Sequence, residues 1–168
     1  KAVKSLVRFA ERFDLPVCVS FRRQALFPAP HESYAGDVGF GANPRLIERL
    51  KDADLVILAG GRLGEVPSQG YSLYPIPNPG VAMVHVHADA DELGRVYQPE
   101  FAINATPRAF AAALEAVQPP NVIPWTDWRQ SARADYLAWT EDTPPNPGAV
   151  QMSTLVRWLR AQPEEMAI

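Results

Sequence analysis

Two short runs in the middle of the chain carry residue types that could bind a ligand. In the first, Gly60, Gly61 and Arg62 follow the apolar run at 55–59. Glycines at the carboxyl end of a buried strand let the backbone turn sharply and approach a ligand, and open α/β sheets bind their ligands at this end. Because no G-x-G-x-x-G pattern is present, two interpretations stay open: a turn facing a phosphate or flavin, and an ordinary strand-to-loop turn.

The second run, His85-x-His87-x-Asp89, ends the apolar stretch at 81–87. Alternate strand residues point the same way, so the run resembles the ligand run of metallo-β-lactamase-like hydrolases. Those enzymes continue with a histidine, whereas Ala90 stands here, and His31 is the only other histidine. We therefore favour two histidines on one face of a strand end, and we assign no metal ligand and no catalytic residue.

The acids after this run have two interpretations. Asp89 and Asp91 could accept hydrogen bonds from a ribose or ribityl hydroxyl. They could instead cap a short helix before Gly94, since negative charge suits a helix N-terminus. We favour capping. His31 lies in a loop segment, either solvated or touching a neighbouring domain or cofactor, and Cys18 lies inside a strand pattern, where a packing role is expected.

Composition limits the function classes. The chain has 168 residues, 47% of them hydrophobic, which suits one core with an appendage. A net charge of −3 with scattered arginines argues against nucleic acid as the main partner. The single cysteine cannot form an internal disulfide and fits a reducing compartment, so we expect a cytoplasmic protein. No apolar run approaches the roughly 20 residues that span a bilayer, so we expect no membrane partner.

The elements that would position these runs alternate between helix and strand. Helices are predicted at 1–13, 43–51 and 106–117, strands at 16–21, 55–59, 81–87 and 101–104, and loops at 22–42 and 60–80. Long crossovers between strands predict an α/β fold with a Rossmann-like, doubly wound parallel sheet. Such a domain normally opens on a strand, whereas this chain opens on a helix, so we expect the first strand to be missing from this sequence.

The character of the chain changes after Gln118. Proline clusters at 119–120 and 144–147 bracket a predicted helix with an aromatic side, and a last amphipathic helix is predicted at about 150–161. We therefore predict three parts: a nucleotide-binding-like domain at 1–118, a Pro/Trp-rich linker with a helix at 119–148, and the start of another domain at 149–168.

Taken together and in order, these features resemble the central domain of thiamine diphosphate-dependent enzymes, the family of acetolactate synthase, benzoylformate decarboxylase and pyruvate oxidase. The resemblance covers about residues 1–118 and is carried by FAERFDLPV at 9–17, LFPAPH at 26–31, YAG at 34–36, LKDADLV at 50–56, GGRL at 60–63, HVHAD at 85–89, ELG at 92–94 and TPRAF at 106–110. The segment at 151–168 resembles the opening helix of the family's diphosphate-binding domain, with Pro163-Glu164-Glu165 leading toward its first strand.

The resemblance implies a central domain (the DHS-like NAD/FAD-binding type) flanked by pyrimidine-binding and diphosphate-binding domains, in a homo-oligomer that acts on 2-oxo acids. It also implies that thiamine diphosphate and magnesium bind elsewhere in the parent enzyme. The G-D-G…N-N motif that holds them is missing, since Val38 follows Gly36-Asp37 and no Asn-Asn pair occurs. We therefore expect a piece that is not catalytic alone.

Several relatives bind FAD in this domain, and the resemblance places the contacts at Gly60, Gly61, Arg62 and Asp89. Two departures favour an empty or vestigial site, because Gly64 and Val66 stand where the acetolactate synthase pattern has an acid and a basic residue. The alternative function is a free-standing FAD- or NAD-binding module.

Overall fold

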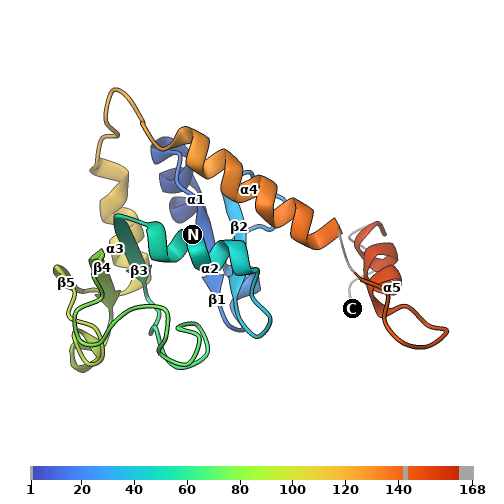
Figure 1. The fold of residues 1–168 in the computed structure, drawn as a ribbon. Coiled ribbons are helices and arrows are strands. Elements are labelled where there is room, and N and C mark those ends of the chain that lie inside the picture. Colours follow the sequence, from blue (N-terminus) through green and yellow to red (C-terminus); the bar gives the residue numbers. More distant parts are fainter. Residues whose placement is uncertain (1, 142–143, 163–168) are drawn as a thin grey trace. The chain divides into compact units, whose positions relative to one another are not determined.

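A computed structural model describes residues 2–141 and 144–162 (Figure 1). The chain divides into two compact units, Lys1–Tyr136 and Leu137–Ile168, which are described separately. The boundaries predicted at 118 and 148 stay a prediction. Pro163-Glu164-Glu165, expected to lead toward a further strand, lie outside the described residues.

The first unit contains two groups of parallel strands. The first half-sheet pairs β1 (Val17–Ser20) with β2 (Tyr34–Val38). The second half-sheet has the order β3 (Leu55–Ala59), β4 (Ala82–His87), β5 (Phe101–Asn104), and both of its pairs are parallel. The parallel α/β architecture predicted from the sequence is confirmed.

One strand was missed. β2 lies inside the segment at 22–42 that was expected to be a loop, which also holds the 3₁₀ turn η1 (Gln24–Leu26). Gly36 and Asp37 interrupt its apolar pattern, and Gly36 has a φ of +121°. The strand forms because its neighbours bury it: Tyr34, Ala35 and Val38 are each at most 5% exposed.

The helices of the first unit begin where the sequence predicts. α1 spans Ala2–Phe13, α2 spans Pro44–Asp52, and α3 (Pro107–Ala113) continues into a 3₁₀ turn, η3 (Leu114–Ala116). Asn43 caps α2 by accepting from the Arg45 amide at 3.0 Å, and Thr106 caps α3 by accepting from the Ala109 amide at 3.2 Å. In both helices proline follows the cap, where its missing N–H costs no intrahelical bond.

Helices cover both faces of the strands. Successive residues of β1 face opposite sides, so Val19 packs with Ala10 of α1 while Cys18 packs with the cluster that includes α2. On α2, Ile47 and Leu50 pack against both half-sheets. On the other side, Arg12 of α1 donates to the carbonyl of Glu115 in η3 at 3.0 Å.

The helix α4 (Thr126–Glu141) begins in the first unit and ends in the second. Its first half docks on the first unit: just before α4, Trp125 donates to the carbonyl of Phe13 at 2.7 Å, and Arg133 donates to the carbonyl of Ala29 at 2.8 Å. The predicted helix with an aromatic side therefore forms, and its first half lies against the first unit.

The second unit holds α5 (Met152–Arg160), which has no buried residue. The side chain of Gln151, directly before it, exchanges hydrogen bonds with the backbone of Asn146, 2.8 Å in each direction. Within the described parts of the chain, no helix has both the length and the apolar character needed to cross a membrane.

Candidate functional site

The structure brings the two runs singled out in the sequence together at one edge of the second half-sheet. Ala59 at the end of β3 lies opposite Val86 of β4, so the segments that follow these parallel strands meet. The Gly60 amide donates to the carbonyl of Val86 at 2.8 Å, and the His85 ring donates from Nε2 to the carbonyl of Gly61 at 3.0 Å. Gly60, Gly61, Arg62 and Asp89 therefore share the carboxyl edge of β3 and β4, where the sequence placed them.

Gly60 is required by the packing of α3. Its φ is +74°, and a Cβ placed on it would lie 2.3 Å from Cγ of Pro107, the first residue of α3. The space that a side chain would fill is thus taken by the helix. Gly61 differs, because a Cβ there would meet only Cδ1 of Leu58, at 3.6 Å.

Arg62 has a partner within the chain. Its guanidinium lies 3.4 Å from the carboxylate of Glu92, which also accepts from Arg95 at 2.8 Å. Glu92 is nearly buried, whereas both arginine side chains are about two thirds exposed, at 66% and 64%. The two guanidiniums thus neutralise a poorly solvated carboxylate while most of their own surface faces solvent.

Asp89 caps the 3₁₀ turn η2 (Ala90–Glu92), as the sequence favoured. Its Oδ1 accepts from the amide of Asp91 at 3.1 Å, and its own amide donates to Nδ1 of His87 at 3.1 Å. The residue is exposed to solvent.

The two histidines of this edge are engaged with the backbone. His85 is 6% exposed, and its burial lowers the pKa of the imidazole below the usual value. Because Nε2 of His85 donates to a carbonyl, the neutral ring of His85 carries its proton on Nε2. Nδ1 of His87 lies 3.1 Å from both the amide nitrogen and the carbonyl oxygen of Asp89. Over residues 2–141 and 144–162, no group of three or more His, Cys, Asp or Glu side chains could hold a metal.

His31 has neighbours in its own unit. Its Nδ1 accepts from the amide of Ser33 at 3.0 Å, and its Nε2 lies 3.1 Å from a carboxylate oxygen of Glu11. The ring also stands edge-on to Phe27, with the ring centroids 5.3 Å apart. These contacts fix the loop between η1 and β2 against α1.

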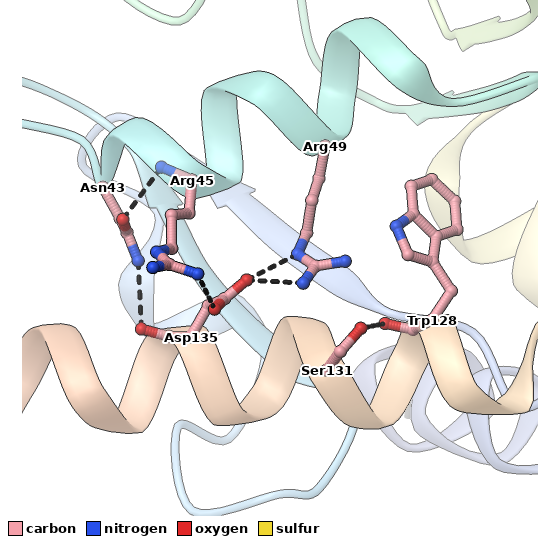
Figure 2. A network of polar contacts seen from close by, with 6 residues as sticks. All are labelled: Asn43, Arg45, Arg49, Trp128, Ser131 and Asp135. Carbon is pink, nitrogen blue, oxygen red and sulfur yellow. Dashed lines mark hydrogen bonds and ion pairs between the residues drawn. The ribbon is translucent and has the colours of Figure 1, made fainter.

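A polar cluster that sequence reasoning missed joins α2 to α4 (Figure 2). Asp135 accepts from Nε and Nη2 of Arg49 at 2.8 and 2.5 Å, and from Arg45 at 3.3 Å. The side-chain nitrogen Nδ2 of Asn43 donates to the backbone carbonyl of Asp135 at 3.1 Å, while the side-chain oxygen Oδ1 of Asn43 caps α2. We call these four residues, Asn43, Arg45, Arg49 and Asp135, the α2–α4 clamp.

The sequence carried part of the signal for this clamp. Arg45 and Arg49 are four residues apart, so they lie on one face of α2. Their partner is about ninety positions away, and nothing in the local pattern identifies it. The clamp orders two helices against each other and involves no group with reactive chemistry.

The residues at this edge of the described structure do not fit thiamine diphosphate or a magnesium ion. The carboxyl edge of β3 and β4 offers Arg62 and Asp89, each already bonded within the chain, and two histidines bonded to the backbone. These side chains form no set of oxygen ligands such as magnesium takes.

Comparison with known proteins gives a family. Residues 1–114 match the family model described as thiamine pyrophosphate enzyme, central domain. The chain is 31% identical over 140 residues to a sulfoacetaldehyde acetyltransferase of Alcaligenes xylosoxydans xylosoxydans, covering 82% of this chain and 23% of that protein. It is 27% identical over 119 residues to the enzyme of the same name from Rhodobacter capsulatus, covering 69% and 20%.

A third relative is the 3D-(3,5/4)-trihydroxycyclohexane-1,2-dione hydrolase of Clostridium perfringens, 31% identical over 86 residues, or 51% of this chain and 14% of that protein. The matches to these three relatives span between 14% and 23% of the relatives' length.

Proposed function

The chain belongs to the thiamine pyrophosphate enzymes, as a central domain, and from this premise we propose that it is a non-catalytic spacer of a larger enzyme that uses thiamine diphosphate and magnesium. The observation that carries the proposal is the engagement of every candidate site residue with the chain itself. Pro107 fills the space beside Gly60, Glu92 pairs with Arg62, and Asp89 caps η2.

The proposed role is to hold the flanking pyrimidine-binding and diphosphate-binding domains, its partners in a cytoplasmic homo-oligomer. Thiamine diphosphate supplies carbanion chemistry when bound, and the protein supplies positioning. By the sequence resemblance, the parent enzyme is a carboligase or decarboxylase acting on 2-oxo acids.

The names of the relatives add a more specific candidate reaction. Two of them are acetyltransferases named for an aldehyde, sulfoacetaldehyde, and a third is a hydrolase named for a dione. Both compounds in these names, the aldehyde and the dione, contain carbonyl groups. Sulfoacetaldehyde is therefore the first substrate to test with the parent enzyme, and pyruvate, a simple 2-oxo acid, is tested beside it.

Activity assays on two proteins test the proposal. The 168-residue chain, supplied with thiamine diphosphate and magnesium, is expected to turn over neither sulfoacetaldehyde nor pyruvate, whereas the parent enzyme turns over one of them. Turnover by the chain alone would overturn the non-catalytic role. A parent enzyme whose activity persists without thiamine diphosphate would overturn the cofactor assignment.

The alternative is a free-standing FAD- or NAD-binding module, for which the shared edge of Gly60, Gly61, Arg62 and Asp89 is the supporting observation. A ligand that binds only the folded state stabilises it by RT ln(1 + L/Kd), where L is the free ligand concentration, and therefore raises Tm. We expect the purified chain to lack flavin absorbance and to show no shift of Tm with FAD or NAD. A shift that grows with ligand concentration and that Arg62→Ala abolishes, without lowering Tm in the absence of ligand, would favour the module.

A further inference from the structure

We propose that α4 is a rigid connector. The first unit fixes both the tilt of this helix and its rotation about its own axis, and with them the direction in which the chain leaves the central domain. Arg133 and Asp135 are the positioning residues. The inference rests on the proposed function, because in the larger enzyme this direction orients the domain that follows.

The end of the first unit falls inside α4. The helix spans Thr126–Glu141, and Tyr136 is the last residue of the first unit. Because one helix continues through this point, the docking of residues 126–136 also determines the axis of the residues that follow them in α4.

A row of side chains on one face fixes the tilt of α4. Trp125, Arg129 and Arg133 are four residues apart, so they lie on the same face. Their partners are the carbonyl of Phe13 at 2.7 Å, the carboxylate of Asp14 at 2.6 Å and the carbonyl of Ala29 at 2.8 Å. These bonds are spread over about 12 Å of helix. Bonds at three levels along the axis resist a tilt that a single bond would permit.

Arg133 and Asp135 together fix the rotation of α4 about its axis. An α-helix turns by about 100° per residue, so side chains two positions apart lie on nearly opposite sides. On one side, Arg133 donates to the carbonyls of Ala29, Pro30 and Tyr34 at 2.8, 3.2 and 3.1 Å. On the other side, the carboxylate of Asp135 accepts from α2 through the α2–α4 clamp (Figure 2). A roll of the helix in either direction would break one of these two sets of bonds.

The stripe of α4 between these two sides is buried. Ala132 is 3% exposed and packs in one cluster with Ala35 of β2 and Leu46 of α2. Tyr136, about one turn later, stands edge-on to Tyr34 of β2. Because the interior is close-packed, the helix has little room to shift between these neighbours.

The charged groups in these contacts are poorly hydrated, which makes the bonds selective for one geometry. The side chains of Arg129 and Asp135 are 13% and 16% exposed. Charge-assisted bonds are about twice as strong as neutral ones, and removing one partner inside a protein leaves the other charge uncompensated. Exposed ion pairs, by contrast, contribute little.

Trp139 illustrates what this docking determines beyond the first unit. It follows Ala132 by about two turns, so it lies on the same face of α4. The residue is 48% exposed. When the rotation of the helix is fixed at Ala132, the side of α4 on which this tryptophan stands is fixed as well.

The distance between two spin labels tests whether α4 is fixed. The labels are attached at Ala109→Cys on α3 and Ala138→Cys on α4, two exposed positions, in a chain in which Cys18→Ala removes the native thiol. We expect one narrow distribution of distances. With Asp135→Ala added, the distribution should become at least about twofold broader, because the helix is released on one side and can roll.

Two further variants separate the clamp from stability in general. Asp135→Glu keeps the carboxylate and should restore much of the narrow distribution. Gly70→Ala strains the backbone at a φ of +68°, where a Cβ would meet no atom within 4 Å, so it should lower stability without broadening the distribution. The proposal is overturned by a broad distribution before Asp135→Ala is added, by equal widths with and without it, or by equal broadening with Gly70→Ala.

Turnover by the parent enzyme tests the functional consequence. The assay is run at a temperature where circular dichroism shows every variant to be folded. Asp135→Ala should lower kcat about tenfold and change KM less, because a small misplacement of reacting groups slows the reaction strongly. Gly70→Ala should leave both values unchanged. An unchanged kcat with Asp135→Ala would overturn the positioning role.

The two measurements distinguish failure of this inference from failure of the proposed function. A parent enzyme without turnover that depends on thiamine diphosphate would overturn the proposed function and with it the positioning role. The label distances would still decide whether α4 is fixed. If Asp135→Ala does not fold, Asp135→Asn, which keeps the shape of the side chain, replaces it in both measurements.

Discussion

The first half-sheet is more deeply buried than the second, although its sequence is the more polar. β2 reads Tyr-Ala-Gly-Asp-Val, and four of its five residues are buried, whereas no residue of the apolar β3 is buried. β2 is covered by α2 on one face and by the part of α4 that belongs to the first unit, where the ring of Tyr136 stands edge-on to Tyr34 with centroids 4.9 Å apart. Within the described part of the chain, β3 has a strand on one side only. In this domain the neighbours of a strand, more than its own residues, set its burial.

The two half-sheets also depend on different contacts to hold their helices. At the first, α4 is held on α2 by the charged α2–α4 clamp (Figure 2). At the second, α3 is held by the close approach of Pro107 to Gly60. Substitutions that act on one contact at a time therefore measure separately how much each contact contributes to the free energy of unfolding.

The largest effect is expected from Gly60→Ala, which acts on the second half-sheet. The new Cβ would lie 2.3 Å from Cγ of Pro107, at a φ of +74°. Strain of the left-handed backbone and overpacking together should lower the free energy of unfolding by about 2–4 kcal/mol. Urea denaturation measures this change.

Gly70→Ala is the matched control for Gly60→Ala. Gly70 has a similar φ of +68°, but a Cβ there has no atom within 4 Å. It should cost only the backbone strain, about 1–2 kcal/mol. If the two substitutions prove equal, Pro107 does not determine the need for glycine at position 60, and a ligand-facing role of the turn regains support.

The next effect is expected from Asp135→Asn, which acts on the first half-sheet. The Asp135 and Arg49 side chains are only 16% and 22% exposed, so the carboxylate is poorly hydrated and its charge-assisted bonds are strong. Losing the charge should lower the free energy of unfolding by about 1–3 kcal/mol. Arg45→Ala is the control, because Arg45 is 73% exposed and its loss should cost at most about 1 kcal/mol. A larger loss of stability with Arg45→Ala would mean that the exposed Arg45, and not Arg49, makes the main contribution to the clamp.

Cys18 gives a pH-dependent test of the burial of the first half-sheet. Burial raises the pKa of its thiol to about 11 from 9.0. The folded state therefore holds the thiol proton more tightly than the unfolded state, so this contribution to stability is complete below pH 9 and is lost as the pH rises through 11. Its size is at most about 3 kcal/mol.

The measurement for Cys18 is the free energy of unfolding between pH 8 and pH 11, with Cys18→Ala as the control. The difference between the wild-type chain and the variant should shrink across this window, because alanine carries no proton to lose. Reaction of the folded chain with a thiol reagent at pH 8 should also be slow. A difference that does not vary with pH would contradict burial of the thiol.

Sequence reasoning succeeded where a local pattern and the tertiary contacts agree. The caps at Asn43 and Thr106, each followed by proline, fixed the starts of α2 and α3. The apolar runs at 55–59 and 81–87 gave β3 and β4, and parallel pairing then placed Gly60–Arg62 near Asp89. These inferences need only the spacing of cap and apolar residues along the sequence and the parallel direction of neighbouring strands.

The rest depended on contacts between distant segments. β2 was missed because Gly36 and Asp37 break its apolar pattern, and its burial comes from α2 and α4. The approach of Pro107 to Gly60 joins positions 47 residues apart, so the sequence could not tell a glycine needed for a helix from one needed for a ligand. The partner of Arg49 was hidden for the same reason.

The smallest effect is expected from Arg62→Ala, at the exposed edge of the second half-sheet. Arg62 is 66% exposed and lies 3.4 Å from Glu92, which keeps its closer bond to Arg95 at 2.8 Å. Such a pair contributes about 0–1 kcal/mol and weakens as salt screens it. Thermal unfolding at low and high salt should therefore give nearly equal Tm values for the variant and the wild-type chain. Glu92→Gln, which affects both arginines, should cost more, because it removes the charge that both guanidiniums share. If Arg62→Ala instead lowered Tm as much as Gly60→Ala, the pair of Arg62 and Glu92 would stabilise the domain as much as the contact between Gly60 and Pro107. The contrast between buried and exposed regions would then fail for the second half-sheet.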